Sequence, residues 1–184
     1  MFKVRRYAAS DAIRVGVLIA DTYGGFNLNA MTLAKRESML GPFARAGSSM
    51  PGDREVIAVA ISAPSVWVAE AEGEIVGVVR GGSTDHRGRT VLSSLFVDGQ
   101  RHRRGVGRML VERFEQEYVE RGVEVFKLSA TLYAVPFYLK MGYQRSTGVR
   151  TMASFGESGL AYQPMKKTVV QEGRTSRGSD ENPK

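Results

Sequence analysis

The 184-residue sequence contains no cysteine and only two histidines. The lack of cysteine excludes disulfides and thiolate nucleophiles, and two histidines leave zinc with few nitrogen ligands, so we expect no metal site. No apolar run approaches the roughly 18 residues that a membrane-spanning helix needs, and we expect no membrane partner. The first residues, 1–6, lack the apolar segment of a secretory signal, so the cytoplasm is the expected location.

The length and the composition favour a single domain. A chain of this size can bury a substantial core without disulfides or metals, and no internal repeat divides it. From Gln171 onward the sequence contains no large apolar residue. We therefore predict one domain over residues 1–168 and a disordered tail over residues 169–184.

The charge is strongly positive, with a net value of +7 and a pI near 9.9, which favours anionic ligands. Arginines crowd into residues 101–108 instead of following a long helix or alternating with aromatic residues. This clustering favours a compact polyanion, such as a phosphorylated cofactor, over duplex nucleic acid. A nucleic-acid-binding module stays open as a less favoured alternative.

The segment over residues 95–108 carries the strongest signal. An apolar strand leads into a short basic loop that contains glycines, and the loop opens directly into a helix. The helix is predicted from about Gly105 to before Gly122, because apolar residues recur at helical spacing: Val106, Met109, Leu110, Phe114 and Tyr118. Its first turn therefore points unpaired N–H groups and the positive end of the helix dipole toward the loop.

These features predict a cradle for a diphosphate at the helix N-terminus. Gly105 and Gly107 lack the Cβ atoms that would keep a ligand away from the backbone, and positive charge comes from Arg103, Arg104 and Arg108. A Walker loop would need a Gly-Lys-Ser/Thr ending, which is absent, and a dinucleotide fingerprint would need glycine in place of Leu110. A basic loop that merely caps a helix is the structural alternative.

The remaining patterns predict a mixed α/β domain built on one sheet. A short strand over residues 2–6 precedes three helices. The first helix should be capped by Ser10-Asp11 and broken by the glycine pair within residues 23–27. The other two are expected over residues 30–40 and 53–61, and a strand over residues 56–61 is the alternative to the last of them.

The rest of the pattern consists mainly of strands. The helix from Gly105 follows the strand over residues 90–97, and a short helix over residues 134–141 follows the strand over residues 123–130. Glu72-Gly73-Glu74 separates the first two as a hairpin turn. Pro164 marks the last strand as an edge or terminal element. The strands are expected over residues 66–71, 75–79, 90–97 and 123–130, after residue 143, and over 160–165.

A second motif follows the basic loop by about thirty residues: residues 133–143 read YAVPFYLKMGY. Together with the first motif, HRRGVG over residues 102–107, it resembles the GNAT superfamily of N-acetyltransferases. The first is similar to that family's acetyl-CoA motif, Q/R-x-x-G-x-G/A, with His102 at the Gln/Arg position. The second resembles its A-x-x-F-Y-x-K-x-G-F/Y segment, and residues 162–166 resemble its last strand.

The resemblance implies a GNAT-like α/β fold: a single twisted sheet of about six or seven strands, flanked by helices and splayed at a cofactor cleft. The arm of acetyl-CoA would insert between the strand that ends at Val97 and the strand near Ser129, binding the polar groups of Leu95, Phe96 and Val97. Tyr133 would line the cofactor or the acceptor channel. The diphosphate would be held by the N–H groups of Arg103, Arg104, Gly105, Val106, Gly107 and Arg108.

The resemblance also implies that Tyr138 protonates the departing CoA sulfur after an amine attacks the thioester. A thiol has a pKa of about 8.5 and a tyrosine one of about 10, so the thiolate is already a fair leaving group and the acid should help modestly. Where the family often has a glutamate as general base, this sequence has Ser93 and Ser94. Candidates for the base by residue type alone are Asp21, Glu70 and Asp98.

The resulting expectation is an acetyltransferase that moves the acetyl group of acetyl-CoA to an amine by direct attack in a ternary complex. The acceptor would be a small-molecule or peptide amine bound by the variable helices over residues 20–64. Without a base, an amine of low pKa is favoured, such as an α-amine or an aminoglycoside-like amine. Members of the family often dimerise, so a homodimer stays open. A CoA-binding sensor or interaction module without catalysis is the alternative.

Overall fold

The computed structural model describes residues 1–48, 50, 52–151 and 160–169. Its strands form one eight-stranded sheet in the order β1-β2-β3-β4-β5-β8-β6, with β7 paired to β8. All pairs are antiparallel except β4 and β5. The strands are β1 (Lys3–Arg6), β2 (Ser65–Ala71), β3 (Glu74–Thr84), β4 (Thr90–Val97), β5 (Val125–Thr131), β6 (Gln144–Arg145), β7 (Arg150–Thr151) and β8 (Ala161–Thr168).

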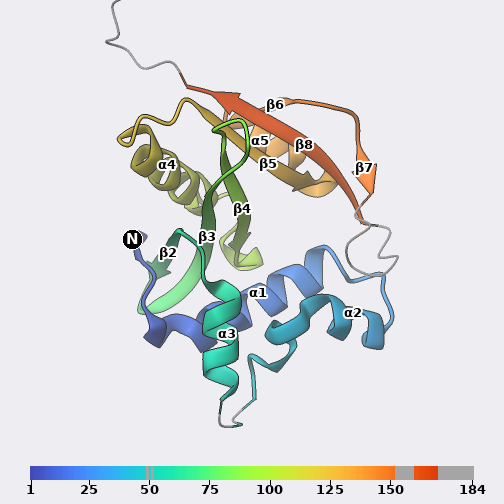
Figure 1. Ribbon diagram of the computed structural model, residues 1–184. Coiled ribbons are helices and arrows are strands. Elements are labelled where there is room, and N and C mark those ends of the chain that lie inside the picture. Colours follow the sequence, from blue (N-terminus) through green and yellow to red (C-terminus); the bar gives the residue numbers. More distant parts are fainter. Residues whose placement is uncertain (49, 51, 152–159, 170–184) are drawn as a thin grey trace, which may run out of the picture.

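Helices cover both faces of this sheet. Figure 1 shows β2, β3 and β4 between α4 on one side and α1 with α3 on the other. Among the described helices, none is long and apolar enough to cross a membrane. The helices are α1 (Ala12–Phe26), α2 (Leu33–Leu40), α3 (Asp53–Ile61), α4 (Val106–Val119) and α5 (Val135–Lys140), joined by 3-10 turns.

The two cores follow from the period-two alternation of the central strands. In β2, Val66 and Val68 pack into the core formed with α1 and α3. Trp67 and Ala69, which point to the opposite face, pack into the core formed with α4 and α5. The predicted mixed α/β architecture with one sheet is therefore confirmed.

The first helix differs from the prediction, because α1 continues through Gly24 and Gly25 to Phe26. A glycine inside a helix costs only about 1 kcal/mol relative to alanine, an amount that packing can offset. Here the packing comes from the end of the helix, where the Phe26 ring stacks on the rings of His102 and Tyr133. The glycine pair was thus wrongly interpreted as a helix break.

The predicted cap of α1 is also wrong in detail. Asp11 is the N-cap residue, but its side chain makes no capping bond to α1. Its carboxylate instead accepts from the N–H of Ala8 at 2.9 Å and from both terminal nitrogens of Arg5, at 2.7 and 3.0 Å. Asp11 therefore joins β1 to the start of the first helix.

The proline of the last strand lies inside the sheet instead of at its edge. β8 is the last strand in the chain but runs between β5 and β6. Ser146 donates its N–H to the Pro164 carbonyl, so the Pro164 nitrogen faces the same neighbour just after β6 ends at Arg145. The missing donor falls where that pairing stops, which explains why a proline is tolerated. The tail predicted beyond β8 lies outside the described residues from position 170 onward.

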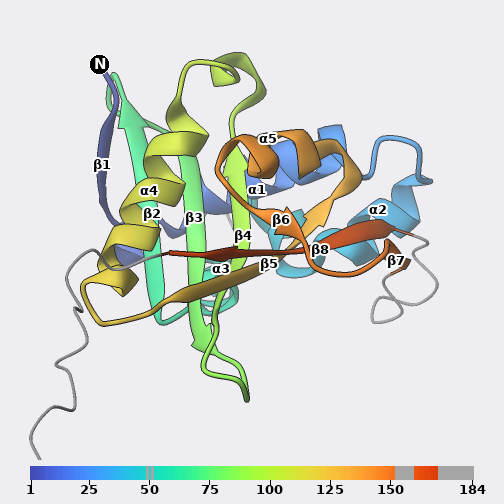
Figure 2. The same ribbon diagram turned by 90° about the horizontal axis from the view of Figure 1, so that it is seen from above.

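The feature that positions the site is the short contact between β4 and β5. These parallel strands pair only at Thr90 with Phe126 and at Val91 with Lys127. Figure 2 shows β5 and β8 turned away from the direction shared by β2, β3 and β4. Within the described residues, the last six residues of β4, 92–97, therefore have no strand partner on their β5 side.

Candidate functional site

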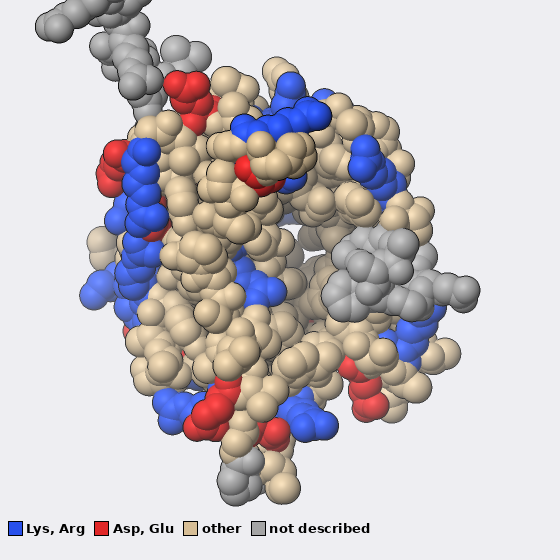
Figure 3. Space-filling view, in the orientation of Figure 1, with Lys and Arg blue, Asp and Glu red and all other residues tan. Residues whose placement is uncertain are grey.

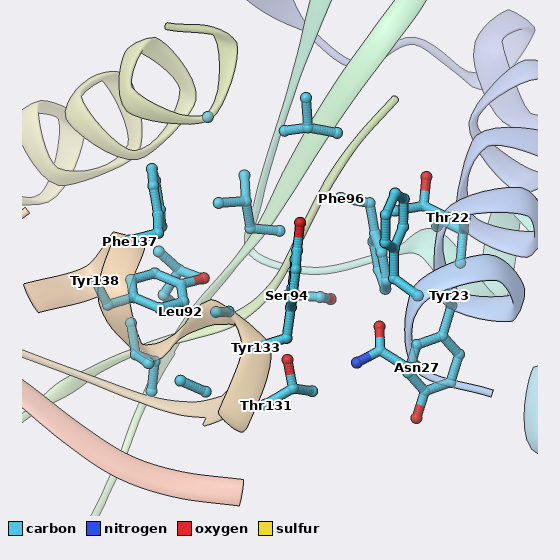
Figure 4. Close-up of a pocket in the computed structure, with 18 of the residues that line it drawn as sticks. Thr22, Tyr23, Asn27, Leu92, Ser94, Phe96, Thr131, Tyr133, Phe137 and Tyr138 are labelled. Atoms are coloured by element: carbon cyan, nitrogen blue, oxygen red, sulfur yellow. The ribbon is translucent and has the colours of Figure 1, made fainter. Parts of the chain in front are cut away.

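The divergence of β4 and β5 opens a cavity of about 990 Å³. Its walls come from β4, the loop and first turn of α4, the end of β5, α5, and the C-terminal parts of α1 and α2. Figure 3 shows this face of the molecule hollowed near its middle. Figure 4 shows Tyr138 of α5 on one side of the cavity and Thr22, Tyr23 and Asn27, from α1 and its C-cap, on the other.

The N-terminus of α4 faces the cavity with free donors. Gly105 is the N-cap residue, with φ +86°, and no side chain caps the helix. The Met109 N–H bonds to the Gly105 carbonyl, so the amides of residues 106–108 precede the helical ladder. These amides and the dipole of α4 form the positive end that the sequence predicts.

The fold itself also requires the two glycines of the loop. A Cβ at Gly105 would meet nothing within 4 Å, so it is the left-handed conformation that requires glycine there. A Cβ at Gly107 would lie 3.3 Å from the Phe137 ring. Gly107 therefore allows α5 to approach α4, and both glycines line the cavity.

The arginines of the loop differ in whether they line the cavity. Arg103 and Arg108 line the cavity, and Arg101 joins them. Arg104 is exposed and is not among the lining residues, so its contribution of charge stays a prediction. Arg108 also contacts Glu112 at 3.9 Å, but both side chains are more than half exposed, so this pair is weak.

Two residues of β4 offer their main chain to the cleft. Asp98 donates its N–H to the Val76 carbonyl of β3, and hydrogen-bonded positions alternate along an antiparallel pair. The N–H and C=O groups of Phe96 therefore face β3, whereas those of Leu95 and Val97 face the open side. The prediction for Phe96 changes accordingly, because this residue lines the cavity with its ring.

His102 closes one end of the open strand edge, a contact that the sequence does not predict. Its Nε2 lies 2.9 Å from the Val97 carbonyl oxygen and must donate to it, so Nδ1 is the acceptor, 3.4 Å from the Tyr133 hydroxyl. The Phe26 ring stacks on both, with centroids 5.0 Å from His102 and 5.6 Å from Tyr133. The one available signal was the replacement of the motif's Gln or Arg by histidine.

Tyr138 is buried on α5, where its ring packs edge-on against Phe137 and Tyr143. Figure 4 shows its hydroxyl directed toward the middle of the cavity. Burial raises the pKa of the Tyr138 phenol well above its usual range, since an anion would be poorly solvated there. The phenol is therefore protonated at neutral pH and can donate a proton, but only as a weak acid.

None of the carboxylates suggested by residue type reaches the cavity. Asp21 is exposed on α1, Glu70 pairs with Arg5 at 2.8 Å, and Asp98 accepts from the Gln100 N–H. Among the described lining residues there is no aspartate or glutamate. Nor does this part of the chain contain a group of three or more histidine, aspartate or glutamate residues able to hold a metal ion.

The described lining also contains a cation that the sequence analysis missed. Arg80 lies on β3, and its Nε donates to the Ser94 hydroxyl of β4 at 2.7 Å. Arg80 sits in an apolar strand and belongs to no motif, so nothing in the sequence singled it out. Its position in the cavity follows only from the register that pairs Arg80 with Ser94.

A family model described as an acetyltransferase (GNAT) domain matches residues 53–169. Solved structures with similar folds include a GCN5-related N-acetyltransferase from Rhodopseudomonas palustris, also described as "Aminotransferase, Class-II" (21% identity, 91% of this chain and 95% of that chain, TM-score 0.71). Another is the PaiA N-acetyltransferase of Thermoplasma acidophilum in complex with coenzyme A (12%, 92% and 99%, 0.68). An aminoglycoside 6'-N-acetyltransferase complexed with coenzyme A is also similar (16%, 91% and 97%, 0.61).

Proposed function

Since the chain belongs to the GNAT family of acetyltransferases, we propose that it transfers the acetyl group of acetyl-CoA to an amine by direct attack in a ternary complex. The observation that carries the proposal is the loss of pairing between β4 and β5 after Val91, beside the uncapped N-terminus of α4. One cleft thus offers a strand edge for an extended amide-containing arm and a positive helix end for a diphosphate. The two similar structures described with coenzyme A support this use of the cleft.

The residues present fit acetyl-CoA. The N–H groups of Leu95 and Val97 and the C=O of Leu95, which face the open side, suit the amides of the pantetheine arm. The Val97 carbonyl is bonded to His102, which the arm would displace. The amides of residues 103–108 would hold the diphosphate, aided by the side chains of Arg103 and Arg108. Bound in this way, acetyl-CoA supplies an activated acetyl thioester.

The reaction requires the amine nitrogen to bond to the thioester carbon while the carbon–sulfur bond breaks. The nitrogen loses one proton and the sulfur gains one. Tyr138 donates the proton to the sulfur and recovers one, through water, from the attacking nitrogen. Direct transfer agrees with a chain that has no cysteine to form an acyl-enzyme. Because the described cavity wall holds no carboxylate, the acceptor has to arrive as the neutral amine or lose its proton to water.

The test is thiol release from acetyl-CoA across a panel of amines, with mass spectrometry of the acetylated product. We expect release that depends on the amine and matches the product formed mole for mole. Binding of CoA with no turnover for any amine would contradict the proposal and support a CoA-binding sensor. Binding of duplex DNA at physiological salt, with no binding of acetyl-CoA, would instead support a nucleic-acid-binding module.

A further inference from the structure

Arg80 is a partly buried cation with no carboxylate partner among the described residues. Its Nε donates to the Ser94 hydroxyl at 2.7 Å, and its Nη1 donates to the Ala60 carbonyl in the last turn of α3. Burial lowers the pKa of the guanidinium, yet an arginine of this kind keeps its charge at neutral pH. By contrast, Arg5 and Arg6 on β1 each pair with a carboxylate at 2.7 Å.

The unused donors of Arg80 are available to a ligand. A guanidinium has five N–H groups in a planar fork, and two of these are used by Ser94 and Ala60. Arg80 also lines the cavity. Since the Ser94 oxygen accepts from Arg80, its own O–H is free to donate, and Figure 4 shows Ser94 within the cavity. Two side chains thus present donors at the same place.

The charge of the cavity points the same way. Its described lining contains no aspartate or glutamate, and it includes the neutral polar side chains of Thr22, Tyr23, Asn27 and Thr131. The other lining cations, apart from Lys140, lie in the loop and first turn that would serve the diphosphate. A polycationic amine would therefore enter a positive field in which the described residues offer no counter-charge. This disfavours polyamines and aminoglycosides as acceptors.

We propose that the acceptor is an amine that also carries a carboxylate, as an amino acid does, and that Arg80 with Ser94 binds this carboxylate. The inference rests on the proposed function and adds its substrate class. A planar guanidinium matches the two oxygens of a carboxylate, and such charge-assisted bonds are strong when they are partly desolvated. The acceptor's carboxylate supplies the counter-charge that the described residues do not provide.

The experiment compares matched acceptors with the full-length protein: several amino acids, each beside its primary amide and its decarboxylated amine. We expect kcat/KM to be about 10- to 100-fold higher for the carboxylate member, the range expected for hydrogen bonds to a charged group. Relative to the amide, the carboxylate raises the pKa of the neighbouring amine, which lowers the neutral fraction and works against the expected preference, so the amide is the stricter comparison. Equal or better rates for the amides would overturn the proposal.

Variants separate recognition from structure. Arg80→Gln should lower kcat/KM for the carboxylate acceptors about 10- to 100-fold and lower it much less for the amides, so that the preference for the carboxylate member is lost. Arg80→Lys keeps the charge and should restore part of the preference. A uniform loss with both kinds of acceptor would mean that Arg80 only supports α3, and it would contradict the proposal. If Arg80→Gln does not fold, the wild-type comparison decides alone.

Failure of the proposed function gives a different result. In that case no amine is acetylated, and the carboxylate site is tested by calorimetric titration of N-acetyl amino acids into the CoA-saturated protein. We expect binding that weakens at least about 10-fold in Arg80→Gln. No binding, or equal binding in both proteins, would overturn the carboxylate site independently of catalysis.

Discussion

At the scale of single residues, the proposed chemistry depends on Tyr138 and on the lack of a carboxylate in the described lining of the cavity. The phenol is buried, stays protonated, and is aimed at the cavity. No carboxylate in the described lining competes with it or shares its proton. The proton transfer from Tyr138 to a thiolate is uphill, because the pKa of the phenol is raised while that of a thiol is about 8.5. Acid catalysis should therefore be modest.

Replacing Tyr138 by phenylalanine should lower kcat by roughly 10-fold, below the usual range for general acids, with the KM for acetyl-CoA unchanged. The measurement is single-turnover acetyl transfer, which isolates the chemical step. Tyr143→Phe is the matched control, because Tyr143 packs on Tyr138 with centroids 5.5 Å apart but does not line the cavity. Full activity in Tyr138→Phe, or equal losses in both variants, would remove the acid role.

The sequence could identify Tyr138 because it stands in a motif, but it could not identify Arg80 or the contacts of His102. Arg80 gains its meaning from Ser94, fourteen residues later on the next strand, and from Ala60 on α3. The place of His102 is set by its bond to the Val97 carbonyl and by the Phe26 ring of α1 that stacks on it. Such contacts depend on register and on packing between distant segments, which no local pattern encodes.

At the scale of elements, the start of α4 is the part on which cofactor binding depends. Gly105 holds the left-handed conformation that turns the loop into the helix, with open space beside it. Bounds predicted from local patterns agree well where a glycine or a turn marks them, as for β4 and α4. The short pairing of β4 with β5 was expected only from the family resemblance. The alternation of apolar and polar residues indicates a strand, but it does not show where two strands separate.

Gly105→Ala should lower stability by about 1–2 kcal/mol, since a Cβ disfavours the left-handed conformation, and should weaken CoA binding about 10-fold by turning the amides. Gly122→Ala is the control: Gly122 has φ +84°, equally open space, and lies beyond the other end of α4. It should lose similar stability and keep its CoA affinity. Urea denaturation and calorimetric titration measure both quantities, and equal effects of the two variants on affinity would contradict the account.

The contacts of Asp11 with Arg5 and Ala8, which join β1 to α1, should make the stability of the protein depend on pH. The Arg5 guanidinium, with the Ala8 N–H, holds the pKa of the Asp11 carboxyl below its usual value. A lowered pKa in the folded state gives stability that is present above the unfolded pKa of about 3.9 and is lost as the pH falls through the folded value.

Asp11→Asn should therefore reduce the free energy of unfolding by about 2 kcal/mol at pH 7, and the difference from wild type should shrink toward pH 2. Urea denaturation at several pH values measures this. Glu74→Gln is the control. It removes the ion pair between Glu74 and Arg14, in which both side chains are partly or largely exposed, and should change stability by less than about 1 kcal/mol. A difference for Asp11→Asn that is constant with pH would contradict the electrostatic origin.

At the scale of the whole molecule, the protein is one sheet with a packed core on each face and a cleft where β4 and β5 separate. One core joins β2 and β3 to α1 and α3, and the other joins the sheet to α4 and α5. The core formed with α4 and α5 contains residues from the strands on both sides of the cleft, so the two parts of the sheet stay packed together where β4 and β5 separate. Sequence patterns predicted the order of elements and the family, but not the charge of the cavity, which is the sum of side chains from many segments.

The central claim is that the main-chain amides of residues 103–108 bind the diphosphate of coenzyme A. The most direct measurement is the amide spectrum of the isotope-labelled protein titrated with CoA and, separately, with pantetheine, which lacks the diphosphate. We expect CoA to shift the amide resonances of residues 103–108 and of Leu95 and Val97, and pantetheine to shift only those of the two strand residues. Saturation with CoA that leaves the resonances of residues 103–108 unmoved would contradict the account.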